Sequence, residues 1–333
     1  MPYEGLSKQR LMRLYPEIRG HRFLFGHGLA SDDTEHTCLV TQALIVSAGE
    51  VRAFSRSLSW RLRFWLLGLP AGIGVATLKA LIKLWIGFPA HRSGVFSAGN
   101  APAMRAAVLG VCYGDDAEKL RLLVRAATRI THTDPKAEFG ALAVALAAYL
   151  ASTEGGAGLT PQRYCRELAI LLGDEGEELL GLMQRMAASV AAGETTEAFA
   201  AALGLERGVS GYVYHTVPVA VHATFRHTGD FRSAVLSVIR CGGDTDTLAA
   251  IAGAIVGAAV LETGIPSEWL RGMVEWPRTL RWMRQLGERV AEVSQERKAQ
   301  RALWVSPISL LLRNLVFLLV VLVHGFRRML PPY

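Results

Sequence analysis

The chain has 333 residues, of which 51% are hydrophobic, and a formal net charge of +7. Its four cysteines are far apart and form no CxxC pair, which excludes a disulfide framework or a zinc site and indicates a reducing, cytoplasmic setting. The first residues lack the apolar core of a signal peptide. The dispersed basic residues match no RNA-binding or helix-turn-helix pattern, so we expect no nucleic-acid partner.

The first motif in chain order is GLASDDTEHTCLVTQALIVSA (28–48), in which Ser31, Asp32 and Asp33 stand directly before a segment with helical apolar spacing. Asp32 and Glu35 have the spacing of a capping box, which is one interpretation of this turn. The other interpretation is a metal site, because Mg²⁺ and Ca²⁺ prefer clusters of hard oxygen ligands.

An apolar stretch follows at FWLLGLPAGIGVATLKALIKLWIGF (64–88). It contains Pro70, several glycines, Lys79 and Lys83, which disfavour a membrane span. We therefore expect two core-facing helices joined at a turn.

A loop of small residues occurs within RSGVFSAGNAPAMRAAVLG (92–110). Four of its residues precede Pro102, which suits the first position of a helix: Ser97, Ala98, Gly99 and Asn100. Such a loop directs free backbone amides at whatever lies above the helix start, and phosphate is the usual occupant. An ordinary turn is the alternative, because small-residue turns alone are weak evidence.

Three segments carry apolar residues at three- and four-residue spacing with strong helix formers between them: 117–130, 136–152 and 166–192. Strands are hard to identify, and the breaks fall at glycine and proline clusters such as 154–162 and 203–212. We therefore predict one all-α domain over residues 1–303.

The stretch CGGDTDTLAAIAGAIVGA (241–258) places two carboxylates, Asp244 and Asp246, directly before an apolar run. A helix cap would use one acidic side chain, whereas this turn also offers the hydroxyl of Thr247. The two glycines before it allow backbone conformations that turn several oxygens toward one point. If the two acidic turns meet in the fold, they supply enough oxygen ligands for two divalent ions.

The last apolar stretch is PISLLLRNLVFLLVVLVHGFRRML (307–330). Its uninterrupted part, Leu315 to Val323, is too short for a bilayer of roughly 30 Å unless Arg313 and Asn314 are carried part-way in. A helix in the membrane surface or a marginal tail anchor fits this pattern, and a helix docked on the domain is the alternative. We predict that residues 304–333 form a hydrophobic, basic tail.

Several motifs together resemble the ADP-ribosylglycohydrolase family: SDDTEHT, SAGNAPAMR, THTDP (131–135), GYVYHTVPVA (211–220) and GGDTDTLAAIAGAIVGA. They occur in the order and approximate spacing of that family. The resemblance implies an all-α orthogonal helix bundle with a site for two Mg²⁺ or Mn²⁺ ions. It also implies a monomeric hydrolase that releases ADP-ribose from an ADP-ribosylated protein or a small-molecule acceptor.

The resemblance further implies roles for individual residues. The metal ligands would be Ser31, Asp32, Asp33, Asp244, Asp246 and Thr247. Asp33 would also act as the catalytic residue by accepting a proton from the attacking water. The substrate-binding residues would be the phosphate loop and three side chains near ADP-ribose: Ser97, Ala98, Gly99, Asn100, Met104, His132 and Tyr212.

Two acidic positions of the family pattern have no counterpart in this sequence. One belongs to a GxxxGDALG-like helix that MPYEGLSKQRLMRLYPEIRG does not contain, and the other aligns with Gly72. The loop also has Ala101 where the family commonly has glycine. These departures leave open a non-catalytic alternative, in which the chain binds metal and ADP-ribose without turnover. A phosphoester hydrolase with the same two-metal chemistry is a more distant alternative.

Overall fold

The computed structural model describes residues 2–330, except for the side-chain surroundings of residues 156 and 157. Over these residues the chain is all-α, which confirms the predicted fold class, and it contains no regular strand. Three short 3₁₀ turns lie at Ala103–Arg105, Asp174–Gly176 and Glu262–Gly264. The α-helices are α1 (Lys8–Leu14), α2 (Asp32–Ser47), α3 (Val51–Leu67), α4 (Val75–Trp85), α5 (Ala90–Ser93), α6 (Ala107–Tyr113), α7 (Ala117–Arg129), α8 (Pro135–Gly158), α9 (Pro161–Leu172), α10 (Glu177–Ala191), α11 (Thr196–Ala202), α12 (Val213–Arg226), α13 (Phe231–Arg240), α14 (Thr245–Val260), α15 (Ser267–Gly272), α16 (Leu280–Glu296) and α17 (Pro307–Arg327).

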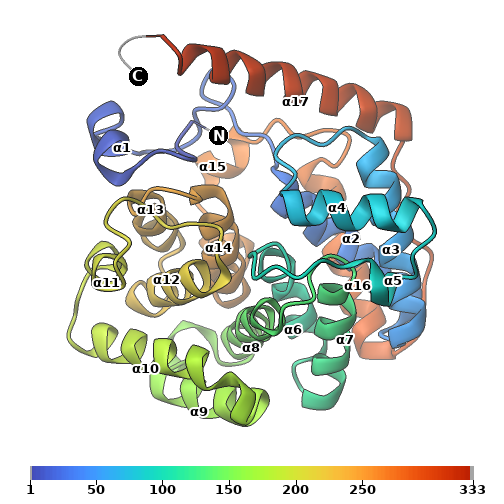
Figure 1. The fold of residues 1–333 in the computed structure, drawn as a ribbon, viewed down its shortest axis with the longest axis horizontal. Helices are drawn as coiled ribbons and strands as arrows, with labels where there is room; N and C mark the ends of the chain where they lie inside the picture. The colour runs from blue at the N-terminus through green and yellow to red at the C-terminus, as the bar shows by residue number, and fades with distance from the viewer. Residues whose placement is uncertain (1, 331–333) are drawn as a thin grey trace.

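Helix α8 lies inside the bundle, where it packs against α6, α12 and α14 (Figure 1). Alanine, leucine and valine occupy most positions between Ala141 and Ala151, and these side chains are buried. A helix that is apolar on all sides is stable only when other helices surround it. Gly110 of α6 lies directly against the α8 backbone, because a side-chain carbon there would come within 1.8 Å of the Ala145 carbonyl oxygen.

The predicted helical segment 166–192 is interrupted in the structure. Helix α9 ends at Leu172 and α10 begins at Glu177. Gly173 between them has a φ of 63°, a left-handed conformation that ends a helix and that glycine adopts without steric cost. The apolar spacing continues through the break, so the sequence pattern alone did not reveal it.

The apolar stretch 64–88 forms the end of α3 and all of α4, joined by a turn, as the sequence predicts. The prediction that both helices face the core is only partly right. Leu81 and Leu84 are buried, whereas Phe64, Ile82 and Trp85 are exposed. This part of the bundle therefore presents large apolar side chains to the outside.

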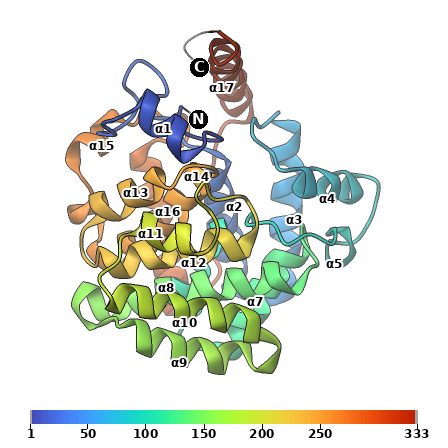
Figure 2. The ribbon, with the colours of Figure 1, turned by 60° about the vertical axis from the view of Figure 1, so that its left-hand side comes forward.

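Helix α17 lies across one end of the bundle, at the top of Figure 1, and Figure 2 shows it nearly end-on. Its buried residues are Arg313, Asn314 and Phe317. Within residues 2–330 it is the one helix that is long and apolar enough to cross a membrane. The side it turns toward the bundle is polar at its centre, and most of its aliphatic side chains are exposed or half-buried.

We expect Gly110→Ala to lower the free energy of unfolding by about 1–3 kcal/mol, because its methyl group meets the α8 backbone rather than a flexible side chain. Gly181→Ala in α10 is the matched control, since nothing lies within 4 Å of its added carbon. That substitution should be neutral or slightly stabilising, as alanine favours helix. Urea unfolding measures both, and equal stability of the two variants would contradict the close α6–α8 contact.

Candidate metal centre

The two acidic turns meet at the N-termini of α2 and α14. Ligand oxygens of Asp32, Asp33 and Asp246 all lie within 4.8 Å of one another, although the helices are far apart in the sequence. Asp32 and Asp33 belong to the first turn of α2, and Asp246 belongs to the first turn of α14. The positive ends of two helix dipoles therefore point toward one group of carboxylates.

Neither acidic turn uses its side chains as a simple helix cap. Ser31 is the N-cap of α2 and Asp244 is the N-cap of α14, and neither makes a side-chain capping bond. The Ser31 hydroxyl instead donates to Asp33 Oδ2 at 2.7 Å. The capping box considered for Asp32 and Glu35 is not formed, because Glu35 accepts hydrogen bonds from residues outside the turn.

The second turn has its shape because Gly242 and Gly243 have φ values of 73° and 80°. A side-chain carbon on Gly243 would come within 2.0 Å of the Val209 carbonyl oxygen. That same carbonyl accepts a 2.8 Å bond from the Asp244 amide. Glycine at this position therefore lets the chain approach residue 209 closely and hold Asp244 beside the α14 N-terminus.

Burial and mutual repulsion make the charged form of these carboxylates unfavourable, so their pKa values are raised. Burial raises the pKa of Asp33, and the charge of Asp246 raises it further, while hydrogen bonds from Ser31 and Thr247 oppose the shift. Burial and the neighbouring Asp33 likewise raise the pKa of Asp32. Burial, followed by the charge of Glu4, raises the pKa of Asp246.

The donor set fits divalent cations. Asp33 is 1% exposed, and among residues 2–330 its Oδ1 atom has no hydrogen-bond partner. A buried carboxylate oxygen without a partner carries a desolvation cost that a bound cation would remove. The other candidate ligand atoms are carboxylate and hydroxyl oxygens, which suit Mg²⁺ or Mn²⁺.

Asn100 connects the acidic cluster to the small-residue loop. Its side-chain amide donates to Asp244 Oδ2 at 2.7 Å and to the Thr216 hydroxyl at 3.0 Å. Burial and the charge of Asp246 raise the pKa of Asp244 to about 6, and the Asn100 bond partly offsets this. Asn100 therefore both orients Asp244 and fixes the loop next to it.

The loop 97–100 pairs with the segment before α12. The backbone amide of Asn100 donates to the Gly211 carbonyl at 3.0 Å, and the backbone amide of Val213 donates to the Ala98 carbonyl at 2.9 Å. Within residues 2–330, the amides of Ser97, Ala98 and Gly99 have no acceptor, which leaves them available to an anion. Pro102 precedes the 3₁₀ turn Ala103–Arg105 and α6 begins only at Ala107, so Pro102 opens a 3₁₀ turn and not an α-helix.

Three further predicted residues surround this loop. His132 lies beneath it, because a side-chain carbon on Gly99 would come within 2.9 Å of His132 Nε2. Burial, followed by the charge of Arg105, lowers the pKa of His132 to about 3, so its ring is neutral at physiological pH. Tyr212 forms a bridge with Gly99, and its hydroxyl accepts a 3.1 Å bond from Lys136. Met104 is buried behind the loop.

Glu4 is an acidic residue near the cluster that the sequence pattern did not single out. Its charge contributes to the raised pKa values of both Asp32 and Asp246. The Gly5 amide donates to the Gly243 carbonyl at 2.7 Å, which attaches the N-terminal segment to the second acidic turn. The residues around Glu4 form no pattern that indicates a site. Only the backbone pairing of Gly5 with Gly243 brings Glu4 to the acidic cluster.

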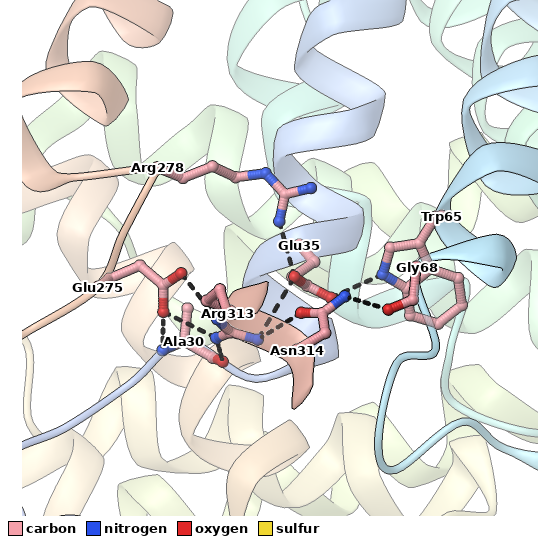
Figure 3. Close-up of polar contacts among 8 residues, drawn as sticks. All are labelled: Ala30, Glu35, Trp65, Gly68, Glu275, Arg278, Arg313 and Asn314. Carbon is pink, nitrogen blue, oxygen red and sulfur yellow. Dashed lines mark hydrogen bonds and ion pairs between the residues drawn. The ribbon is translucent and has the colours of Figure 1, made fainter. Parts of the chain in front are cut away.

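A buried ionic network supports the first acidic turn from the other side of α2 (Figure 3). Glu35 accepts bonds from Trp65 Nε1 at 2.6 Å and from Arg278 at 2.7 Å, and Arg313 lies 3.6 Å away. Arg313 also bonds to Glu275 at 2.7 Å. Two carboxylates and two arginines thus neutralise one another inside the protein.

This network holds the backbone just before the first acidic turn. Glu275 accepts the Ala30 amide at 2.9 Å, and Arg313 donates to the Ala30 carbonyl. Asn314, the next residue of α17, donates to the Gly68 carbonyl at 2.7 Å. Helix α17 therefore fixes Ala30, which is adjacent to Ser31, and the sequence pattern of the tail did not predict this contact.

The helical bundle and the convergence of buried carboxylates at two helix N-termini define an all-α protein with a candidate site for divalent cations. The family model for ADP-ribosylglycohydrolase matches residues 1–300, and the chain belongs to the ADP-ribosylglycohydrolase family. The family resemblance stated from the motifs is thereby confirmed. Membership indicates a hydrolase that acts on ADP-ribosylated substrates, in a family that is metal-dependent in general.

Individual relatives cover most of the chain. A protein of Archaeoglobus fulgidus described as uncharacterized is 29% identical over 280 residues, which are 82% of this chain and 86% of that one. The ADP-ribosyl-(dinitrogen reductase) glycohydrolase of Rhodospirillum rubrum is 25% identical over 244 residues, 73% of each chain. A solved ADP-ribosylglycohydrolase-related protein complex shares the fold with a TM-score of 0.56 and 24% identity, covering 79% of this chain and 81% of that one.

We expect Mg²⁺ to raise the melting temperature more at pH 7.5 than at pH 5. The pKa of Asp244 is raised from 3.8 to about 6, so the metal-free folded state holds a proton that the unfolded chain releases. Metal-free stability should therefore fall as the pH rises from about 4 through about 6. Mg²⁺ competes with this proton, so its effect grows above that range.

Asp246→Asn tests the site directly, because it keeps the side-chain shape and removes one charged ligand. Its Mg²⁺-dependent rise in melting temperature should be largely lost. Asp230→Asn is the matched control, since Asp230 caps α13 away from the cluster and Asn caps equally well. Unchanged Mg²⁺ affinity in Asp246→Asn would contradict the metal assignment.

Arg313→Ala should lower the free energy of unfolding by about 3–5 kcal/mol, because it leaves the buried Glu275 without its charged partner. It should also weaken Mg²⁺ binding, since Ala30 loses a hydrogen bond next to the metal-binding turn. Arg232→Ala, which breaks an exposed ion pair, should change both quantities little. Urea unfolding and calorimetric Mg²⁺ titration measure the two effects, and wild-type behaviour in both would contradict the role of Arg313.

Proposed function

We propose that this protein is a metal-dependent hydrolase that cleaves the glycosidic bond of an ADP-ribosylated protein or a related ADP-ribose conjugate. Two Mg²⁺ or Mn²⁺ ions would be held by the two acidic turns: Ser31, Asp32, Asp33, Asp244, Asp246 and Thr247. The observation that carries this proposal is the close grouping of Asp32, Asp33 and Asp246, with an oxygen of buried Asp33 that has no hydrogen-bond partner among residues 2–330.

Glycoside cleavage passes through an oxocarbenium-like state, so the site has to hold the sugar and direct a water at its anomeric carbon. When bound, the divalent ions would supply positive charge for the ribose hydroxyls and lower the pKa of a water. Asp33 is our candidate for accepting a proton from that water, because its pKa is raised from the usual aspartate range. Glu4 is a second carboxylate near the cluster and can accept or return a proton.

The substrate phosphates would bind the amides of the loop 97–99, next to Asn100 and its partner Asp244. Neutral His132 would act there as a hydrogen-bonding group rather than as a cation. Tyr212 would lie beside the adenosine or ribose, with Lys136 directed at its hydroxyl. Met104 would support the loop from behind.

The alternative is a family member that binds metal and ADP-ribose without turnover. Gly72, where the family pattern has an acidic residue, lies exposed in the turn between α3 and α4. That turn therefore offers no acid or base of its own. Under this alternative Asp33 would serve only to bind the ions.

We further propose that the protein works in the cytoplasm as a monomer, with a catalytic domain over residues 1–303 and a hydrophobic, basic tail over residues 304–333 that docks on it through Arg313 and Asn314. Residues 307–330 would hold the domain at a membrane surface. The exposed aliphatic side chains of α17 support this placement.

Calorimetric titration with ADP-ribose, in Mg²⁺ and in EDTA, tests binding. Turnover of ADP-ribosyl-arginine, ADP-ribosyl-serine and O-acetyl-ADP-ribose then tests catalysis. We expect Mg²⁺-dependent binding and release of ADP-ribose from at least one substrate. Asp33→Asn should reduce the rate by roughly 100-fold or more, and Asp230→Asn should leave it unchanged.

Binding without turnover of any conjugate would support the non-catalytic alternative. Absence of ADP-ribose binding in the presence of Mg²⁺ would contradict both functions. If Glu4→Gln lowers turnover while preserving Mg²⁺ affinity, the N-terminal carboxylate takes part in proton transfer rather than in metal binding.

A further inference from the structure

Two segments of the chain contain many basic residues and no acidic ones. Residues 51–114 include eight Lys and Arg, and residues 297–333 include six, without a single Asp or Glu in either segment. The rest of the chain has more acidic than basic residues, so the net charge of +7 comes from these two segments. Such a separation of charge favours an anionic partner on one part of the molecule.

The fold brings the two segments together. A hollow of about 710 Å³ lies between the end of α3 and the start of α17, and both segments line it. Phe64 and Leu67 contribute from α3, Leu311 contributes from α17, and Trp304 comes from the chain just before α17. Figures 1 and 2 place the start of α17 near the end of α3 in both views.

An exposed aromatic cluster continues from this hollow. Phe64 stacks on Trp60 with ring centres 6.0 Å apart and meets Trp85 of α4 edge-on at 6.2 Å. The Arg63 guanidinium lies 4.6 Å from the Trp60 ring. These aromatic side chains are between 41% and 61% exposed, far above what a core position would show. Aromatic rings beside arginines are typical of the headgroup region of a membrane.

Helix α17 adds a long aliphatic face to the same surface. Nine of its large apolar side chains are exposed: Ile308, Leu311, Leu312, Leu315, Val316, Leu319, Leu322, Val323 and Phe326. Arg313 and Asn314 point the other way, into the network with Glu275 and Gly68. A helix that crossed the bilayer would have to remove Arg313 from that network, whereas a helix in the membrane plane keeps it.

We infer that α3, α4 and α17 together form one docking surface for an anionic lipid bilayer, with α17 lying in the membrane plane. This inference rests on the proposed membrane location of the tail and extends it to the aromatic cluster of α3 and α4. Aromatic and aliphatic side chains would enter the interface, and basic residues outside the core, such as Arg63, Lys79 and Arg327, would meet anionic headgroups, whereas Arg105 and Arg313 are buried and would not. A second copy of the chain is a poorer occupant, because it would bring the same positive charge to the contact.

Vesicle co-sedimentation of the full-length protein tests this surface. We expect binding to phosphatidylcholine vesicles that contain about 30% phosphatidylserine, and weaker binding without that lipid or at high salt. Phe64→Glu and Trp85→Glu should each reduce the bound fraction about tenfold, since each removes a large apolar contact and adds a negative charge. Leu319→Glu in α17 should do the same.

Ile170→Glu is the matched control, because Ile170 is 78% exposed on α9, at the opposite end of the bundle from α17. It should bind vesicles as the wild type does. Thermal melting of each variant confirms that it is folded, and Mg²⁺ affinity in solution should be unchanged in all four.

Three results would overturn the inference. If Leu319→Glu abolishes vesicle binding and Phe64→Glu and Trp85→Glu do not, the tail alone docks and the joint surface is wrong. If the wild type binds neither vesicle, the membrane location fails as well, while the hydrolase proposal is untouched. If light scattering shows a dimer that Phe64→Glu and Leu319→Glu both dissociate, the surface binds a second copy.

Discussion

The mutual repulsion of buried carboxylates is the constraint on which this structure depends. Asp32, Asp33 and Asp246 lie together where two helix N-termini meet, and burial raises the pKa of each. Helix dipoles and hydrogen bonds to Asp33 and Asp244 lower the free-energy cost of keeping these carboxylates charged, but they do not remove it. Helix α14 packs against α8 and α12 and also contacts α2, which keeps the two turns together. A bound cation would remove this cost, which is the physical basis of the proposed metal site.

Two residues after Asp33, the charge of another buried carboxylate is neutralised in a different way. Glu35 is buried like Asp33, but Arg278, Arg313 and the indole N–H of Trp65 surround it. Its negative charge is therefore compensated without a bound cation. Helix α2 thus carries acidic side chains toward α14 on one side and toward α17 on the other. Because Arg313 reaches both Glu275 and Ala30, the position of the metal-binding turn depends on the tail helix.

The distribution of charge separates two parts of the molecule. Acidic side chains gather inside, at the candidate metal centre, while the basic excess belongs to the segments that form α3, α4 and α17. The interior cluster is therefore the candidate site for cations, and the outer surface is the proposed site for anionic headgroups. Helix α17 takes part in both, because its polar side supports the acidic turn and its aliphatic side faces outward.

The sequence by itself determined the all-α class, most helix positions and the two acidic turns, because helical spacing and local charge are properties of neighbouring residues. It also carried the motifs of the family. The tertiary structure alone decided that Asp33 and Asp246 meet, that Glu4 lies near them, and that Arg313 is buried against Glu275. It also decided that Phe64 and Trp85 face outward. Apolar spacing shows that a helix has a face, whereas the path of the whole chain sets what covers that face and which distant charges become partners.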